Sequence, residues 1–471
     1  MTSPASAQPE VKKKASPNTI VLILFIILVT CLLTWIIPAG KYVRITDAAG
    51  HKIIDPNKFS YIARSPVSPL VIPIHIVKGF ISSVKLFIAI LFSGGAFQLI
   101  NKSGALHSII ASLVKKFSNK LHIFIPVLSF AFTLICTVKG VNTFIPFAPI
   151  LVFVAKAMGL DSIVGVAIIL LGGAVGFSTG TLNTSTTIVA QNLSGLPAYS
   201  GIGYRAFCLV VFSIVTNIYL VRYALKIKKE PTCSPMYDLD HSEGNVVDQH
   251  SLDEFGPMTG QKWLTLLTMF GTLGVIVGGS MFAHWSLVEM DAGYLWMAFL
   301  IAIILRLSPG EAVQEFFKGM RTMLFAASII CVARAVSSIL TAGKIIDTII
   351  YAMSLVLQVV PTYLLGPVMY FVNVIINILI TSGSGQAVVV IPIMAPLADM
   401  VGITRQTAIL SFNFGDGFCN YILPTSSALM GILSVGKVPY DRWMKFMWKL
   451  FLIWLFTGSI LMIGAQLIHL A

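Results

Sequence analysis

The sequence has few charged residues for its length. They make up 11% of the 471 residues, whereas hydrophobic residues make up 56% and the mean hydropathy is +0.88. A chain of this composition cannot expose most of its residues to water, which excludes a soluble globular protein. Apolar runs of roughly 17 to 25 residues, the length that crosses a bilayer, recur throughout. We predict an all-α polytopic membrane protein with about 11–14 transmembrane segments.

Sequence signatures of enzymes are missing as well. The eight histidines form no HExxH motif and no other paired metal-ligand spacing, and no Walker A loop occurs. The six cysteines are scattered and show neither a metal-binding pattern nor a disulfide framework. We therefore expect no cofactor, no enzyme activity and no ATP-driven pumping by this chain; a membrane-embedded enzyme is the least favoured interpretation.

The net charge of +13 does not indicate nucleic acid binding, because the lysines and arginines lie in the segments that connect apolar runs. Three lysines in the polar tail, residues 1–18, predict that the tail is cytoplasmic and that residues 41–80 form an external loop. The first apolar run lacks a cleavage site, so we expect a retained helix. The polar segment 226–262 begins with lysines and separates a first half, 19–225, from a second half, 263–471. We interpret it as a cytoplasmic linker.

The two halves resemble each other. Pro149 lies 243 residues before Pro392, and other landmarks repeat with nearly the same offset. The first repeat, about 78–225, is expected to start outside the membrane, and the second, about 318–471, to start inside. We therefore predict inverted repeats, each with a re-entrant hairpin and an interrupted helix. Such repeats are the best sequence indication of a transporter site near the bilayer midplane.

Small polar residues interrupt the apolar runs of both halves, in segments 176–187 and 381–427. Non-helical backbone at bilayer depth is stable only where it is buried in protein or lines a watery cavity. Hydroxyl and carbonyl oxygens there suit Na⁺, and helix N-termini suit a carboxylate. The alternatives are polar contacts between packed helices, or an ordinary loop. The candidate substrate- or ion-binding residues are Asn183, Thr184, Ser185, Thr186, Thr381, Ser382, Ser384, Gln386, Asp416, Thr425 and Ser426.

Charges inside the apolar runs are rare and costly, and each is a functional candidate. Asp416, between two glycines, can bind Na⁺, a proton or a substrate amine, and Ser382 and Thr425 are further candidates for Na⁺. Na⁺ or H⁺ is therefore the expected coupling ion. Arg334 lies in the middle of an apolar run, and an ion pair between Arg334 and Asp416 is the structural alternative for both.

A third charge lies beside the first-half hairpin. Lys139 precedes Gly140 and Asn142 there, and Lys139 and Asn142 are candidates to face the substrate. The alternative for Lys139 is that its long side chain only reaches towards the membrane interface.

Several short motifs resemble one family. They are TSGSGQA at 381–387, Pro392 and Pro396, Gly402, Arg405-Gln406, FGDG at 414–417 and PTS at 424–426. Together they resemble the YfcC-like branch of the DcuC (C4-dicarboxylate carrier) family, within the ion-transporter superfamily of inverted-repeat carriers. The resemblance implies a multi-pass secondary carrier of the bacterial inner membrane with elevator-like alternating access. Similar proteins are assigned to C4-dicarboxylates or to basic amino acids of the arginine/ornithine exchange type.

One departure bears on the substrate. Relatives associated with basic amino acids carry an acidic pair where this chain has Lys139. A cationic substrate would meet a lysine there, whereas a carboxylate would meet Lys139, Arg334 and helix N-termini. We therefore expect an ion-coupled or exchanging carrier for a small carboxylate-bearing metabolite, a C4-dicarboxylate or an amino acid, that works in the lipid bilayer and is compatible with a homodimer. The alternatives are a basic amino acid antiporter and, in another class, an ion channel or membrane scaffold.

Overall fold

A computed structural model of the chain describes residues 19–46, 52–105, 108, 120–138, 140–183, 185–241, 258–283, 285–400 and 402–470. Three predictions fall outside these residues: the tail 1–18, Lys139 and Thr184. The described part of the chain is almost entirely helical, and seven of its helices are long and apolar enough to cross a membrane. Five further apolar helices are shorter. The prediction of an all-α polytopic membrane protein is confirmed.

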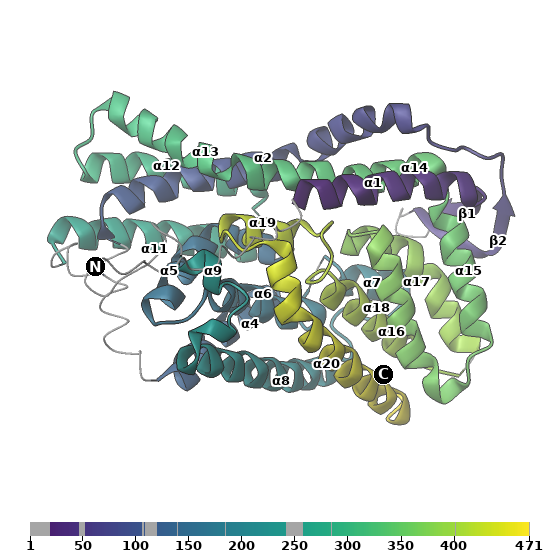
Figure 1. Cartoon of the computed structure of the whole chain (residues 1–471). Coiled ribbons are helices and arrows are strands. Elements are labelled where there is room, and N and C mark those ends of the chain that lie inside the picture. The colour runs from purple at the N-terminus through teal and green to yellow at the C-terminus, as the bar shows by residue number, and fades with distance from the viewer. Residues whose placement is uncertain are drawn as a thin grey trace, which may run out of the picture.

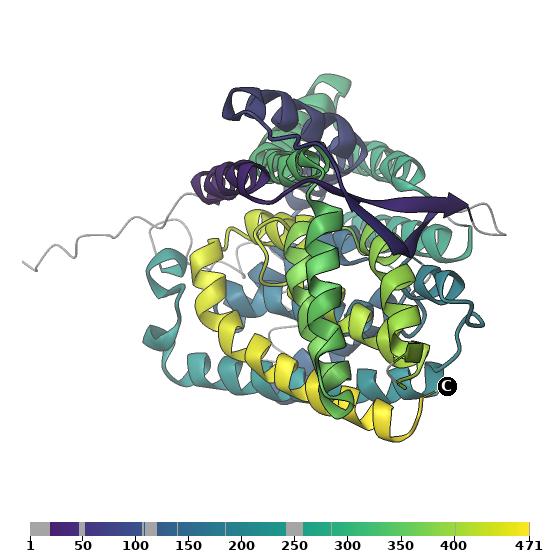
Figure 2. The same cartoon turned by 90° about the vertical axis from the view of Figure 1, so that its right-hand side faces the viewer.

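The helices form two layers (Figures 1 and 2). The upper layer in Figure 1 contains the long helices and is called the scaffold layer: α1 (Thr19–Ile36), α2 (Ile72–Lys102), α12 (Leu287–Ile304), α13 (Pro309–Ala333) and α14 (Ala335–Gly343), with α11 (Gly260–Phe282) packed on α12. The lower layer, called the core, contains the interrupted helices together with two long ones, α8 and α20. Its helices are α4 (Leu121–Cys136), η2 (Val141–Phe147), α5 (Ala148–Ala157), α6 (Ser162–Ser178), α7 (Thr187–Leu193), α8 (Ile202–Lys229), α16 (Thr362–Leu379), α17 (Gly383–Met400), α18 (Arg405–Cys419), α19 (Ser427–Val435) and α20 (Tyr440–Leu467).

Helices α2 and α13 hold the scaffold layer together and run in opposite directions. Gly94 of α2 packs on Gly319 of α13, where a Cβ would lie 3.0 Å from the Gly319 carbonyl oxygen, and Gly79 packs on Cys331. Small residues allow such close backbone approach, which is a common way to associate helices in a membrane. Corresponding helices of the two halves are thus antiparallel at this contact, as inverted repeats require.

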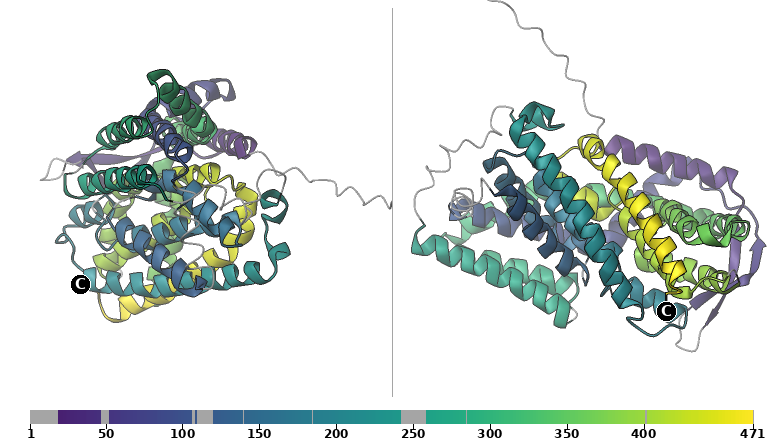
Figure 3. Two further views of the ribbon diagram at one scale, coloured as in Figure 1. Left: turned by 90° about the vertical axis from the view of Figure 1, so that its left-hand side faces the viewer. Right: turned by 90° about the horizontal axis from the view of Figure 1, so that it is seen from below.

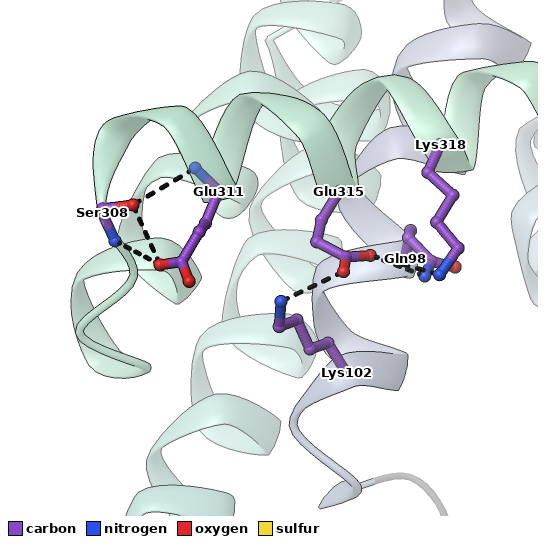
Figure 4. Close-up of polar contacts among 6 residues, drawn as sticks. All are labelled: Gln98, Lys102, Ser308, Glu311, Glu315 and Lys318. Carbon is purple, nitrogen blue, oxygen red and sulfur yellow. Dashed lines mark hydrogen bonds and ion pairs between the residues drawn. The ribbon is translucent and has the colours of Figure 1, made fainter.

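The linker-side end of this pair carries a polar cluster (Figure 4). Ser308 and Glu311 form a capping box that starts α13. One turn further, Glu315 accepts hydrogen bonds from Gln98 Nε2 and Lys102 Nζ of α2, both at 3.0 Å. These contacts fix the register of α13 on α2 at this end of the pair.

Each half of the core contains a hairpin and an interrupted helix. In the first half α4 ends at Cys136, and η2 and α5 return from Val141, so the first tip lies between them; α6 ends at Ser178 and α7 begins at Thr187, which defines the first break. In the second half α16 and α17 meet at a tip at 380–382, and α18 breaks at 420–426 before α19. The first hairpin enters from the linker side of the core and the second from the opposite side (Figure 1). Both predicted features are confirmed. The arms of the first hairpin are among the shorter apolar helices, whereas α16 and α17 are long enough to cross a membrane.

Helices α8 and α20 cover the face of the core remote from the scaffold layer (Figure 3). The Tyr219 hydroxyl donates to the Phe446 carbonyl oxygen at 2.6 Å, and Trp454 Nε1 donates to Thr216 Oγ1 at 2.8 Å. These bonds satisfy polar groups that lipid could not.

Residues 41–80, predicted to form an external loop, contain regular structure. Strands β1 (Gly40–Thr46) and β2 (Lys52–Tyr61) form an antiparallel ribbon, followed by η1 (Pro69–Val71). Phe59 of β2 stacks on Tyr351 of α15 (Ile346–Gln358) with ring centroids 4.2 Å apart. An isolated two-stranded ribbon is marginal in water, so these contacts with the helices stabilise it.

The described start of the linker is folded onto the core. It forms η3 (Pro231–Cys233) and α9 (Tyr237–Asp240). Asp240 accepts hydrogen bonds from the Ser162 backbone N–H at 2.8 Å and from its hydroxyl at 2.5 Å, and pairs with Lys156 at 3.3 Å. Arg442 Nη1 donates to the Pro235 carbonyl oxygen at 2.6 Å. The linker therefore begins as a fixed part of the core.

Candidate substrate and ion site

The second hairpin tip, the first helix break and α18 meet inside the core. A Cβ at Gly383, in the tip, would lie 2.6 Å from both Asp416 Oδ2 of α18 and Thr186 Cγ2 of the first break. Gly417 of α18 packs in the same way on Ser178, the last residue of α6. Because these contacts leave no room for a side chain, glycine is required for the three segments to approach one another.

Asp416 is the only charged residue among these contacts, and it is 1% exposed. Neither carboxylate oxygen has a hydrogen-bond partner. Its backbone carbonyl oxygen accepts from Asn420 Nδ2 at 2.6 Å and from Asn377 Nδ2 of α16. An isolated buried carboxylate is costly, so this group needs a proton or a cation.

The predicted alternative for Asp416, an ion pair with Arg334, is wrong. Both residues are described, and the structure contains no ion pair between them. Arg334 lies at the junction of α13 and α14, where its Cβ is close to Gly79 of α2. It therefore belongs to the scaffold layer, whereas Asp416 belongs to the core.

Other polar atoms near Asp416 also lack partners. Gly180 in the first break has a positive φ of 64°, and a Cβ there would meet both Asn413 Nδ2 and Thr187 Oγ1. Asn413 Nδ2 and Oδ1, Thr187 Oγ1 and Ser178 Oγ are all buried without a hydrogen-bond partner. Buried polar groups in folded proteins are normally bonded. We call Ser178, Thr187, Asn413 and Asp416 the central cluster. Its unpaired hydrogen-bond donors and acceptors could bind a ligand, an ion or water.

Several predicted site residues shape the breaks. Asn183 Oδ1 accepts from the backbone N–H groups of Ser185 at 3.0 Å and Thr186 at 3.1 Å, which forms the turn before α7. Ser426 caps α19 by accepting from the Leu429 N–H at 3.5 Å. Thr425 Oγ1 is buried without a partner in the second break. Asn183 and Ser426 thus hold the backbone of the two breaks in place, and Thr425 adds a further hydroxyl without a hydrogen-bond partner.

The second tip holds the remaining predicted residues. Ser382 Oγ accepts from the Gly385 N–H at 3.4 Å, and Thr381 is partly exposed. Gln386 Nε2 donates to Asn373 Oδ1 at 3.1 Å, and its Oε1 has no partner. Ser384 is exposed.

At the first tip, Asn142 lies against the scaffold layer. It lines a small cavity with Ser93 of α2 and Tyr294 of α12, and its Oδ1 is buried without a partner. The structure therefore places Asn142 at the boundary of the two layers, and Asn142 forms no hydrogen bond with the Asp416 carboxylate.

Two larger cavities lie between the layers, one towards each end. A cavity of 510 Å³ on the β-ribbon side reaches Ser382 and Gly385 of the second tip. A cavity of 410 Å³ on the linker side is bounded by Gln98 of α2, Pro149 of α5 and Lys437 after α19. The central cluster is not among the residues that line either of them.

Among the buried charges that sequence reasoning missed, two retain polar atoms without hydrogen-bond partners. Arg205, in the first turn of α8, is 0% exposed; its Nη2 donates to Gln406 Oε1 at 2.9 Å, whereas Nε and Nη1 lack partners. Asp291, in the first turns of α12, is buried with one unpartnered oxygen. Both lie at the edges of apolar runs, where a charge is expected to be hydrated. A survey that extended each run by one turn would have included them.

Sequence comparisons agree with this architecture. The model of the DcuC family, described as "C4-dicarboxylate anaerobic carrier", matches residues 16–467. The chain is 27% identical over 498 residues to the "Putative basic amino acid antiporter YfcC" of Escherichia coli strain K12, with 97% of each chain covered. It is 29% identical over 504 residues to an uncharacterized protein of Haemophilus influenzae, with 96% of this chain and 98% of that protein covered.

Two solved structures are similar in part. The Alcanivorax borkumensis YdaH transporter has a TM-score of 0.42 at 17% identity and covers 95% of this chain and 98% of its own. Neisseria gonorrhoeae MtrF, from a class of antimetabolite efflux pumps, has a TM-score of 0.41 at 16% identity and covers 96% of each chain. The family match extends over nearly the whole sequence, and the protein is therefore a member of the DcuC family of membrane transporters.

Proposed function

We propose that the protein is a secondary active transporter that carries a small carboxylate-bearing metabolite, a C4-dicarboxylate or an amino acid, across the bacterial inner membrane. The observation that carries this proposal is the central cluster, where buried polar atoms without partners lie at the meeting point of the second hairpin tip, the first helix break and α18 with Asp416. Interrupted helices around such a site are typical of inverted-repeat transporters.

Asp416 is the proposed site of ion coupling. Its carboxylate takes up H⁺ or binds Na⁺, and either event removes an isolated charge from the core. Ser382 of the tip and Thr425 of the second break are proposed to supply further oxygen ligands for Na⁺. The backbone N–H groups at the start of α17 and α19 would then hold the substrate carboxylate, since helix N-termini favour anions.

The core is proposed to move against the scaffold layer in an elevator-like way. Two observations support this motion. The scaffold pair α2 and α13 is packed through glycines, which makes it rigid, whereas open cavities separate the scaffold layer from the core on both sides. The linker side is proposed to face the cytoplasm, because Lys226, Lys228 and Lys229 end α8 there.

Transport by purified protein in liposomes tests the proposal. We expect labelled succinate or another carboxylate to accumulate only with an ion gradient or with unlabelled substrate inside. Counterflow exchange identifies a carrier, because a channel cannot drive it. Gradient-independent, non-saturable flux would instead support the channel, and absence of flux across a panel of carboxylates and amino acids would contradict the proposal.

Exchange of basic amino acids is the second candidate. The E. coli relative carries that description, and Asp416 can neutralise a substrate amine. The same liposomes loaded with ornithine and offered labelled arginine distinguish the two candidates. Arginine exchange without carboxylate transport would replace the first proposal by this one.

A further inference from the structure

The cavity on the β-ribbon side has walls from three parts of the chain. Strand β1 contributes one wall and the end of α14 another, and the tip of the second hairpin contributes Ser382 and Gly385. Its volume of 510 Å³ is sufficient for a small metabolite. Gly383, between those two tip residues, lies against Asp416, so the same tip borders both the cavity and the proposed site.

Positive charge predominates on these walls. The charged residues that line the cavity are Lys41, Arg44, Lys344 and Asp347. Both carboxylate oxygens of Asp347 have partners. Oδ2 accepts a hydrogen bond from the Tyr42 N–H at 3.0 Å, and Oδ1 forms an ion pair with Arg44 at 3.4 Å. Lys41 and Lys344 are exposed and have no ion-pair partner in the described part of the chain.

The backbone holds both free lysines in position. Lys344 ends α14 with a left-handed φ of 55°, and its carbonyl oxygen accepts from the Gly40 N–H at 3.0 Å. This bond fastens the start of β1, and therefore Lys41, to the end of α14. Thr341, one turn earlier on α14, lines the same cavity and is exposed. The two ammonium groups thus come from neighbouring, mutually bonded segments.

We propose that this cavity is an entry site that captures small carboxylate anions before they reach the second hairpin tip. Lys41, Lys344 and Arg44 attract the anion, and Ser382 lies at the boundary between the entry site and the core. Clefts lined by one sign of charge raise the local concentration of the oppositely charged substrate. The inference rests on the proposed transport function and adds the sign of the substrate charge.

Thiol reactivity can test the charge of the cavity without a transport measurement. Cys233 is the exposed cysteine among six, the other five being buried, so Cys233→Ser removes the background. Thr341→Cys then places a thiol in the cavity of the full-length protein. Its reaction rates with anionic 2-sulfonatoethyl and cationic 2-trimethylammonioethyl methanethiosulfonate are each divided by the rate for a free thiol. We expect the anionic reagent to be favoured by roughly 3- to 10-fold at low salt.

Charge variants in the same background give the control. Lys344→Gln and Lys41→Gln should each reduce this preference, and 0.5 M KCl should abolish it, since salt screens exposed charges. Lys78→Gln is the matched control, because Lys78 is an exposed lysine of α2 that does not line the cavity. Ser337→Cys, on the same wall, serves as a second probe if Thr341→Cys folds poorly. Equal normalised rates, a cationic preference, or an equal effect of Lys78→Gln would overturn the entry site.

Transport kinetics then separate this inference from the proposed function. In liposomes that exchange labelled succinate, Lys344→Gln should raise KM by several-fold at low salt with unchanged kcat. Succinate exchange that is insensitive to Lys344, Lys41 and salt would reject the entry site and leave the carrier intact. An anionic preference in the thiol assay, with no flux of any substrate, would support the entry site and reject the carrier.

Discussion

Replacement of Asp416 by asparagine is the most direct test of the proposed coupling site. Asparagine keeps the shape of the side chain and removes the charge, and both carboxylate oxygens are buried without partners, so the exchange breaks no protein hydrogen bond of that side chain. An unpaired carboxylate in such surroundings costs several kcal/mol. The wild-type protein therefore needs a bound cation or proton there, and the variant does not. We expect normal folding and loss of ion-coupled transport.

The size of the effect follows from ligand linkage. Na⁺ at 100 times its Kd stabilises the folded state by about 2.7 kcal/mol, and the variant should lose this increment entirely. Thermal unfolding of the purified protein in NaCl and in choline chloride measures it. If H⁺ is the coupling ion, Na⁺ has no effect on either protein, and a pH gradient drives uptake by the wild type alone.

Asp399→Asn is the matched control. Asp399 is 47% exposed and pairs with Arg405 at the surface at 2.6 Å, an interaction worth at most about 1 kcal/mol. Its loss should leave transport and the Na⁺ response unchanged. Wild-type coupling in Asp416→Asn, measured beside this control, would refute the reasoning and reduce Asp416 to a structural residue.

Three further substitutions have distinct expected outcomes. Gly383→Ala places a Cβ 2.6 Å from Asp416 Oδ2. Transport should fall at least 10-fold, and the strain should lower the unfolding free energy by about 1–3 kcal/mol. Unimpaired exchange would show that the tip is not closely packed in the working protein. Arg334→Gln should raise the KM for a carboxylate if this guanidinium contacts substrate during the cycle, and a change only in protein yield would assign it to the scaffold. Asp240→Ala removes the hydrogen bonds from Ser162 and should lower the unfolding free energy by about 1–3 kcal/mol with KM unchanged, as thermal unfolding and uptake can verify.

The hairpins and breaks were predictable because prolines and small polar residues interrupt the apolar runs there. Pro149 and Pro392 recur at matched positions, and polar residues at bilayer depth require a special backbone. The β-ribbon was not predictable in the same way: its strands lie in a polar, proline-containing segment, and contacts with distant residues such as Tyr351 stabilise it. These contacts join parts of the chain that no local pattern relates.

The residues of the candidate site also differ in whether the sequence could indicate them. Asp416 was found because a charge in an apolar run is conspicuous. Asn413 was missed because one amide near such a run has many ordinary explanations. Its significance is that neither polar atom of its side chain has a partner, a property that depends on the surrounding helices α6 and α7. Only the three-dimensional arrangement separates such a residue from an amide bonded within its own helix.

The docked start of the linker has a consequence for the range of motion. Asp240 is bonded to the core, and α11 begins with Gly260 beside the scaffold layer, so 18 residues, 242–259, connect His241 to α11 in the sequence. A chain of 18 residues can span at most roughly 60 Å, about twice the hydrocarbon thickness of a bilayer. A segment of this length cannot limit the proposed movement of the core. In that proposal the end points of the movement are set by contacts between the surfaces of the two layers, and substitutions between the layers, rather than changes in linker length, should alter them.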